Sequence, residues 1–291
     1  MRAFLTAAIA SSVVGLSCAG GGQVAAQSGE STVRRVAVTA ATPVFTVDLV
    51  HGAITVAGHD APYIEFVVTR TTSAKTDADR AAADREVRLD VVEGPEGATL
   101  CASMPYRERC DDPDPWRRGR DRDDQRPGYT VSFDVVAKVP RTTRVVVKTI
   151  DGGPLRISDL DGPVDARHVN GGIDAAGLTQ GGRLRTVNGD VRLTLPTNPR
   201  APLSVETVNG DVVAQFAAGL SADFWIASAF GRVFSEFDVT RLAPMAPVAD
   251  RSDGHLRYRF DRAFGIRVGQ GGPAHRFTTL NGDICIVARG Q

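Results

Sequence analysis

The chain has 291 residues, with 34 basic and 34 acidic side chains, so its formal net charge is zero. This balance argues against nucleic acid as a partner, because nucleic-acid-binding domains carry a basic surface. Thirty glycines and only 6% aromatic residues suit an all-β chain with many tight corners and an aliphatic core. The length is enough for one large domain or two small ones.

Residues 1–26 have the pattern of an export signal. A basic start is followed by the mostly apolar residues 3–14 and by a small-residue cleavage site at Val24-Ala25-Ala26. The apolar run is too short to span a bilayer in the mature chain. The sequence therefore predicts an exported protein in the periplasm, at the outer membrane or on the cell surface. A lipoprotein signal ending at Cys18 is the alternative, and it fits poorly because Leu16 stands two places before the cysteine instead of three.

Residues 33–149 are predicted to form a β-rich lead-in to a set of repeats. Period-two alternation of apolar residues favours strands at 35–38, 44–50, 53–56, 64–69, 87–91 and 129–135. The segment from Thr76 to Glu86 has a polar start and three consecutive alanines, so it is the one predicted helix. We expect this helix and the alternating residues 256–260 to cap the ends of the domain.

Residues 104–128 break the pattern, because they contain seven arginines, seven acidic residues and four prolines. Such a segment cannot bury a core, so a mobile, solvated loop is predicted. A partner-binding loop around Trp116 is the alternative. Cys101 and Cys110 flank the start of this loop, and in an exported chain they are predicted to form a local disulfide.

A six-residue motif, Thr-Val-Asn-Gly-Asp-Val, organises residues 150–289. It occurs at 186–191 and 207–212 and returns as Thr-Leu-Asn-Gly-Asp-Ile at 279–284. Looser copies surround Gly52, Gly152, Gly171 and Gly231. From Gly171 the glycines of successive copies follow at intervals of 18, 21 and 21 residues, up to Gly231. A period of about 20 residues indicates a stack of similar units, and it suits one coil of a β-solenoid with two or three short strands.

In such a stack we expect Val187 and Val208 to face the interior and the threonines of the motif, Thr186, Thr207 and Thr279, to form an outward row. Asparagine amides at equivalent corners can form a ladder, and glycine tolerates the backbone angles of a sharp corner. The predicted corner ladder consists of Asn170, Asn188, Asn209 and Asn281 with Gly171, Gly189, Gly210 and Gly282.

The repeated motif behind an export signal resembles the bacterial envelope β-solenoid domains known as the putative adhesin family, of the DUF4097 type. The resemblance covers residues 33–289 and is strongest over 130–216. It implies an all-β, single-stranded β-solenoid or β-helix and a location in the cell envelope. It transfers no catalytic residues to this chain.

The acidic residues that follow the corner glycines, Asp190, Asp211 and Asp283, are the sharpest functional candidates. Like charges stacked in adjacent coils repel, so either each carboxylate caps corner amides or a cation lies between Asp190 and Asp211. Calcium prefers such oxygen clusters. Because the glycine-rich calcium repeat is absent, corner capping is favoured and no cofactor is predicted. Cys285 is expected to face away from its neighbours Ile284 and Ile286.

No Gly-x-Ser-x-Gly, His-Glu-x-x-His or phosphate loop occurs. We therefore expect a non-enzymatic envelope protein, an adhesin or scaffold whose coil faces meet glycan or protein partners. One alternative is a carbohydrate-active lyase or hydrolase with charged residues on one face, drawn from Asp165, Arg167, Arg183, Arg185 and Arg192. The other is a structural module whose uncapped terminal coil stacks on a second copy. The sequence leaves the oligomeric state open.

Overall fold

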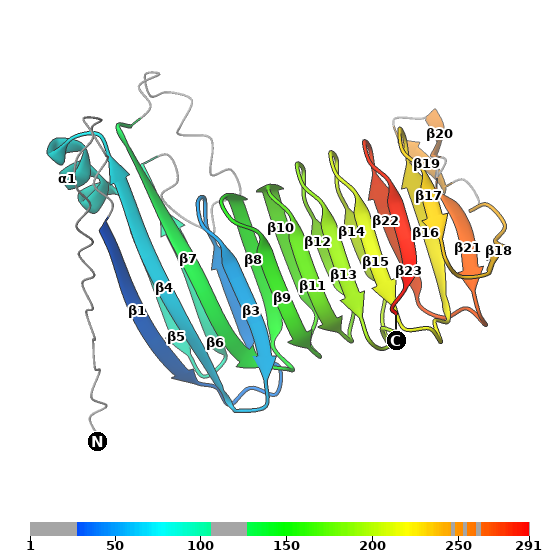
Figure 1. Ribbon diagram of the computed structural model, residues 1–291, viewed down its shortest axis with the longest axis horizontal. Coiled ribbons are helices and arrows are strands. Elements are labelled where there is room, and N and C mark those ends of the chain that lie inside the picture. Colours follow the sequence, from blue (N-terminus) through cyan, green and yellow to red (C-terminus); the bar gives the residue numbers. More distant parts are fainter. Residues whose placement is uncertain (1–27, 106–126, 246–247, 253–254, 260–262, 291) are drawn as a thin grey trace. The chain divides into compact units, whose positions relative to one another are not determined.

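The computed structural model describes residues 28–105, 127–245, 248–252, 255–259 and 263–290. The chain divides into two compact units, Met1–Leu155 and Arg156–Gln291. Figure 1 labels the helix and strands of both. Within the described residues the chain is all-β apart from one helix. The predicted signal peptide with Cys18, and nearly all of the predicted charged loop with Cys110 and Trp116, lie outside the described residues.

The first unit has two sheets. Its strands are β1 Ser28–Ala37, β2 Val44–Asp48, β3 Ile54–His59, β4 Tyr63–Ala74, β5 Arg88–Gly94, β6 Gly97–Ser103, β7 Tyr129–Pro140 and β8 Arg144–Asp151. One sheet has the order β1-β4-β7-β3 and the other the order β8-β2-β6-β5. Alternate side chains of β4 and β7 in one sheet and of β8 in the other are buried, and the rings of Phe45 and Phe66 lie 6.2 Å apart in the core.

The helix α1, Asp77–Glu86, confirms the helix predicted from the sequence. Thr76 is its N-cap, with an extended backbone and a hydroxyl that accepts a hydrogen bond from the amide of Asp79 at 3.1 Å. Ala83 is its one buried residue, and it lies where the helix contacts β4 and β7. The described part of the chain contains no helix with the length and hydropathy needed to span a membrane.

The second unit is built from the repeats. Its strands are β9 Leu155–Leu160, β10 Val164–Asn170, β11 Ile173–Leu178, β12 Gly182–Arg185, β13 Val191–Leu195, β14 Leu203–Glu206, β15 Val212–Phe216, β16 Ala222–Ser228, β17 Val233–Ser235, β18 Val239–Arg241, β19 Val248–Ser252, β20 His255–Arg259, β21 Phe264–Val268, β22 Ala274–Thr279 and β23 Ile284–Ala288. One sheet has the order β9-β11-β13-β15-β23-β17 and the other the order β18-β21-β16-β22-β14-β12-β10. Each repeat gives one strand to each sheet, and we call one repeat with its two strands a coil.

Parallel pairing keeps equivalent residues of the repeats in register. Val191 pairs with Val212, and Val212 pairs with Ile284, so three aliphatic side chains form one fully buried row. In the other sheet Leu184 pairs with Val205, and both are buried. Each such side chain contributes on the order of 2 kcal/mol through burial. The predicted alternation of buried and exposed residues is confirmed.

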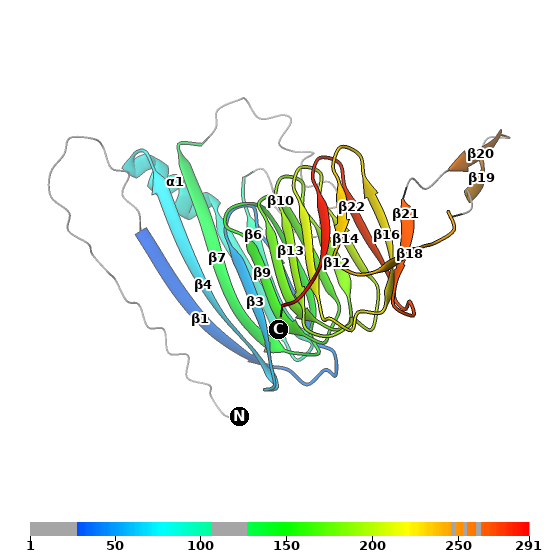
Figure 2. The same ribbon diagram turned by 45° about the vertical axis from the view of Figure 1, so that its right-hand side comes forward.

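The last repeat of the sequence is not the last in space. β23 lies between β15 and β17, and β22 lies between β14 and β16; both are drawn in red between yellow strands (Figures 1 and 2). The corner glycine Gly282 therefore packs on Gly210, and Gly231 packs on Gly282. Spacing along the chain alone would place the Gly231 copy directly on the Gly210 copy, whereas the structure places the Gly282 copy between them.

The segment between the last two repeats adds antiparallel strands. β21 pairs with β16, and β18 pairs with β21, so one sheet of the second unit continues beyond its parallel part. Residues 256–260 were expected to cap the stack. The described part of that segment forms β20, which pairs with β19 in a separate two-stranded sheet.

Candidate functional site

The corners of the second unit bring the motif residues together. Gly189, Gly210 and Gly282 have φ angles of 157°, 156° and 157°, in a region that L residues with a side chain rarely adopt. The coils also approach closely here, because a Cβ on Gly210 would lie 2.1 Å from the carbonyl oxygen of Gly189. These positions therefore require glycine for two independent reasons.

The predicted asparagine residues form a continuous chain of side-chain hydrogen bonds. Nδ2 of Asn188 donates to Oδ1 of Asn170 at 2.8 Å, Asn209 donates to Asn188 at 2.8 Å, and Asn281 donates to Asn209 at 2.7 Å. The row ends at Phe230, which takes the place of asparagine in the terminal coil. The backbone amide of Phe230 donates to the carbonyl of Leu280, as the amides of the asparagines do to the equivalent carbonyls in the other coils. Each amide satisfies its neighbour, so the ladder holds the coils in register.

The threonines of the motif face the interior, which corrects the predicted outward row. Thr186, Thr207 and Thr279 are buried, and each hydroxyl donates to a glycine carbonyl of the neighbouring coil at 2.7, 2.9 and 3.0 Å. Val187 and Val208, expected inside, are half-exposed. Because the hydroxyl pairs with a corner carbonyl, threonine is buried without leaving an unsatisfied polar group.

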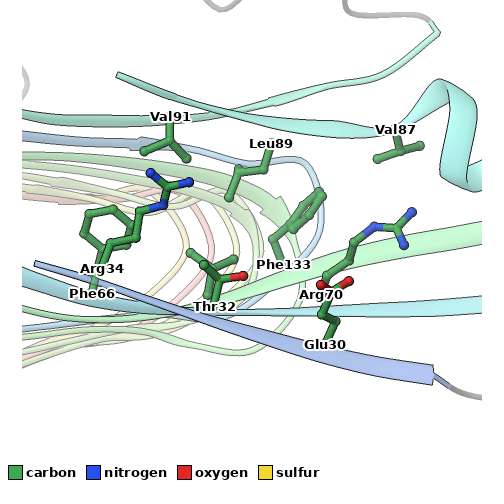
Figure 3. A pocket seen from close by; sticks show the side chains of 10 residues that line it. Glu30, Thr32, Arg34, Phe66, Arg70, Val87, Leu89, Val91 and Phe133 are labelled. Atoms are coloured by element: carbon green, nitrogen blue, oxygen red, sulfur yellow. The ribbon is translucent and has the colours of Figure 1, made fainter. Parts of the chain in front are cut away.

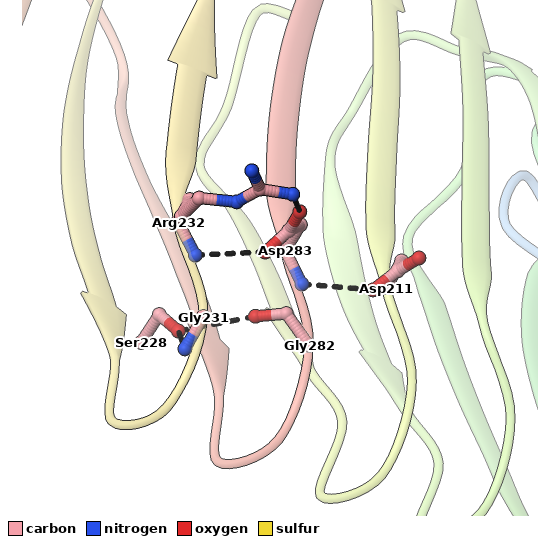
Figure 4. Close-up of polar contacts among 6 residues, drawn as sticks. All are labelled: Asp211, Ser228, Gly231, Arg232, Gly282 and Asp283. Atoms are coloured by element: carbon pink, nitrogen blue, oxygen red, sulfur yellow. Dashed lines mark hydrogen bonds and ion pairs between the residues drawn. The ribbon is translucent and has the colours of Figure 1, made fainter.

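The carboxylates form a second ladder beside the asparagines. Oδ1 of Asp190 accepts from the amide of Asp211 at 3.0 Å, and Oδ1 of Asp211 accepts from the amide of Asp283 at 2.8 Å. Arg232 ends the row, since its backbone amide and its guanidinium donate to Asp283 at 2.8 and 3.0 Å (Figure 4). The backbone amide and then the guanidinium of Arg232 lower the pKa of the Asp283 carboxyl. The carboxylates thus cap corner amides.

The predicted cation alternative rests on Asp190 and Asp211, and each of these carboxylates already accepts an amide of the next coil. The second oxygen of Asp190 accepts from the guanidinium of Arg192 at 2.7 Å. Within the described ranges no group of three or more His, Cys, Asp or Glu side chains is arranged to hold a metal ion.

The cysteines occupy three different settings. Cys101 is buried on β6, and Cys110 lies outside the described residues, so the predicted disulfide stays a prediction. Cys285 is a free, half-buried thiol that faces away from the buried Ile284 and Ile286, as expected. Burial, and then the charges of nearby aspartates, raise the pKa of the Cys285 thiol.

The core of the second unit contains a buried histidine that the sequence analysis did not single out. His275 is fully buried, its ring lies 5.2 Å from that of Phe224, and its Nδ1 accepts from the amide of Leu203 at 3.1 Å. No hydrogen bond satisfies its Nε2. Burial lowers the pKa of His275 from 6.5 to about 4, so the folded protein holds this side chain neutral.

This shift predicts a loss of stability in acid. Below about pH 6.5 the unfolded chain protonates His275 while the folded chain does not until about pH 4. The free energy of unfolding should therefore fall by on the order of 3 kcal/mol between these values. His275→Asn keeps an acceptor near Nδ1 and cannot be protonated. Denaturant titrations at pH 7.5, 5.5 and 4.5 should show a shallower pH dependence in the variant, and equal slopes would contradict the assignment.

Four arginines gather on the exposed side of the sheet that contains β10, β12, β14, β22 and β16. We define the arginine face as Arg167, Arg183, Arg185 and Arg276 together with Asp165, Glu206 and Trp225. Parallel register places Arg183 beside Asp165 and Arg185 beside both Arg167 and Glu206. The predicted Arg192 is not part of this group, because it lies on β13 in the other sheet.

The acids of the arginine face are fewer than its bases and are already paired. Asp165 accepts from Arg167 at 3.0 and 2.9 Å, and Glu206 lies 3.4 Å from the guanidinium of Arg185. The hydrogen bonds that Arg167 donates to Asp165 raise the pKa of Arg167. Among the described residues Arg183, which is exposed, makes no ion pair. Among the described residues of the face, positively charged side chains therefore outnumber negatively charged ones.

An aromatic side chain borders the arginines. Trp225 on β16 pairs in register with Arg276 and, on its other side, with Gly265. A Cβ on Gly265 would lie 2.9 Å from the indole, so the ring lies over this glycine. Trp225 is half-buried, and its ring leans toward β21, on the side of β16 away from Arg276.

The separation of the acids does not suit glycoside hydrolysis. Asp165 on β10 and Glu206 on β14 are separated by β12, and Glu206 lies two residues further along its strand. Two strand spacings and two residues separate their backbone positions by roughly 12 Å, which is wider than the about 5–9.5 Å between the paired carboxylates of most glycosidases.

The first unit contains a small cavity of about 220 Å³ (Figure 3). It is lined by Glu30, Thr32, Arg34, Phe66, Val68, Arg70, Val87, Leu89, Val91 and Phe133. The guanidinium groups at its rim are engaged, since Arg34 lies 3.4 Å from Glu93 and Arg70 lies 2.8 Å from Asp84. The cavity offers mainly apolar space.

Comparison with known proteins gives a limited result. No protein-family model matches the chain, and no curated protein sequence matches it. A solved structure described as a "putative cell adhesion protein" from Clostridium sporogenes is similar with a TM-score of 0.46 and 8% identity, and the match covers 90% of this chain and 100% of that one. A "putative adhesin" from Parabacteroides distasonis gives a TM-score of 0.20 and 12% identity, with 89% and 97% covered. At these values neither structure establishes a family, and the resemblance to the DUF4097-type domains stays a prediction.

Proposed function

We propose that this chain is a non-enzymatic, exported envelope protein of the adhesin or scaffold kind, and that its repeats form a β-solenoid whose arginine face binds an extended acidic glycan. The observation that carries the proposal is the arginine face itself. Its four guanidinium groups come from three parallel strands, β10, β12 and β22, with β14 between β12 and β22, while its two carboxylates are already paired.

The solenoid part of the proposal is supported by the continuity of the repeats. Three rows of hydrogen bonds, from asparagine, threonine and aspartate side chains, run through the same corners. Both sheets keep parallel register through β12 and β14 and through β13 and β15. A stack of this kind offers long, flat and rigid surfaces, which suit extended partners.

The chemistry of the face favours an acidic glycan over a neutral one. Arginine binds carboxylate and sulfate groups through paired donors. A half-buried indole supplies an apolar surface for a sugar ring, and Trp225 pairs in register with Arg276. A repeating polymer can present its charges at intervals that match successive strands.

The test compares binding of a sulfated or uronic-acid polysaccharide with binding of neutral dextran. Arg183→Glu/Arg185→Glu should weaken binding of the acidic polymer at least about tenfold, which is about 1.4 kcal/mol. The matched control is Arg156→Glu/Arg192→Glu, which makes the same change of charge on the other sheet and should have little effect.

Two outcomes would contradict the proposal. An equal loss of binding affinity in both double variants would indicate unspecific attraction by charge. Equal binding of dextran and of the acidic polysaccharide would show that the ligand need not be acidic.

New reducing ends or unsaturated products after incubation with the polymer would favour the alternative lyase or hydrolase. A partner retained only from the protein fraction of an envelope extract would favour a protein-binding scaffold.

A further inference from the structure

The second unit ends in a strand edge that its own described strands leave open. β17 pairs with β23 on one side and is the last strand of its sheet. The carbonyl of Arg232 accepts from Ile284 at 2.9 Å, and the amide of Glu236 donates to Ile286 at 3.0 Å. Because peptide groups alternate in direction along a strand, those of Val233 and Ser235 point away from β23.

The corner of this coil does not continue the stack. Phe230 replaces the asparagine of the ladder and is 80% exposed. The hydroxyl of Ser228 donates to the carbonyl of Gly282 at 3.1 Å and accepts from the amide of Gly231 at 2.9 Å (Figure 4). Arg232 closes the carboxylate row. A further parallel coil would find neither ladder to extend, so the open edge suits a different pairing.

The sequence of this edge is complementary to itself. It reads Arg232-Val233-Phe234-Ser235-Glu236, with Phe234 at its centre. The geometry points to an antiparallel pairing of β17 with β17 of a second copy, which makes a twofold dimer through this edge. In that register Phe234 faces Phe234 of the second copy, and Arg232 faces Glu236 at both ends.

The hydrogen-bond pattern agrees with this register. Antiparallel strands alternate hydrogen-bonded and non-hydrogen-bonded pairs. With Phe234 in the central, non-hydrogen-bonded pair, the flanking pairs join Val233 to Ser235 of the second copy. These are the two residues whose peptide groups point outward from β23. The strand direction and the free backbone groups therefore select the same pairing.

The exposed side chains also favour it. Phe234 is 45% exposed and lies under the guanidinium of Arg232, whose carbon is 5.1 Å from the ring centroid. Side chains that face each other across antiparallel strands interact most strongly when they are aromatic or oppositely charged. Within its own chain Arg232 also donates to Asp283, and Glu236 also accepts from the amide of Ala288 at 2.9 Å, so only their remaining nitrogen and oxygen atoms face the second copy. A twofold pairing buries both phenylalanines and satisfies an edge that otherwise invites disordered aggregation. The inference does not depend on the arginine face, which lies on the other sheet.

The test is analytical ultracentrifugation of the full chain over about 5 to 500 µM, a range that detects a weak dimer. The weight-average mass should rise from one copy toward two. Phe234→Asp places two carboxylates opposite each other and should weaken dimerisation at least about tenfold. Phe230→Asp is the matched control, because it removes an exposed phenylalanine of the same coil outside the proposed pair and should leave the dimer intact.

A charge exchange makes the test specific for the register. Glu236→Lys and Arg232→Glu each place like charges opposite each other in a homodimer, so each variant alone should remain monomeric. Mixed together, they restore two attractive pairs and should form a heterodimer, which only folded chains can do. A monomer at every concentration, equal weakening by Phe234→Asp and Phe230→Asp, absence of recovery in the mixture, or assemblies larger than a dimer would overturn the inference.

Discussion

Replacing Gly210 with alanine is expected to destabilise the second unit by at least about 3 kcal/mol, the sum of backbone strain and a steric conflict. The φ angle of Gly210 is 156°, and a Cβ there would lie 2.1 Å from the carbonyl oxygen of Gly189 and 2.5 Å from its carbonyl carbon. Both contacts are with backbone. Relieving the clash between the new Cβ and the backbone of Gly189 would require the two coils to move apart.

Separation of the coils has a further cost. The carbonyl of Gly189 accepts the hydroxyl of Thr207 at 2.9 Å, and the amide of Gly210 donates to the carbonyl of Asn281 at 2.9 Å. Moving one corner therefore disturbs hydrogen bonds on both neighbouring coils. These bonds lie beside buried residues, where an unsatisfied group costs about 1–3 kcal/mol.

The measurement is denaturant unfolding followed by far-UV circular dichroism. Gly219→Ala is the control, because no atom lies within 4 Å of a Cβ at that position and its φ angle is outside the positive region. This variant should change the free energy of unfolding by no more than about 0.5 kcal/mol. A similar change in both variants would show that the corner does not need glycine for the reasons given.

The sequence predicted the repeats well because their chemistry is local. Alternation around Val191 and Val212 follows from the period of a strand, and the helix over 76–86 has its own capping residue. The predicted orientations of Thr207 and Val208 are wrong, because the structure buries the threonine and leaves the valine half-exposed. Hydropathy places valine inside, yet the buried hydroxyl of Thr207 satisfies a corner carbonyl that valine would leave without a partner.

The order of the coils could not be obtained from spacing, because pairing in space need not follow the chain. One signal was nevertheless present. Asn209 and Asp211 need an asparagine and an aspartate on the next coil to extend their ladders, and the copy at 279–284 supplies both. The copy around Gly231 supplies neither, so it suits the end of the stack. The dimer edge and the arginine face depend on this order, since Arg276 and Trp225 become neighbours only through it.

Removing residues 274–291 is therefore expected to disrupt the whole second unit rather than shorten it by one coil. β22 and β23 separate β14 and β15 from β16 and β17, so their loss leaves two groups of strands without their shared partner. The buried row of Phe216, Phe224 and Phe277 is broken as well, since Phe224 loses the ring 5.5 Å away. We expect no cooperative unfolding transition from this unit in the truncated chain.

Two point variants at one register position test the same order of the coils. Ile284 in the middle of the stack pairs with Val233 in the terminal coil, yet Ile284 is fully buried and Val233 is half-exposed. Ile284→Ala should cost about 2–5 kcal/mol, and Val233→Ala about 1 kcal/mol or less. Unfolding is followed by the fluorescence of Trp225 in a Trp116→Phe background. If the coils were stacked in sequence order, the C-terminal repeat would be the terminal coil, and both the truncation and Ile284→Ala would have small effects.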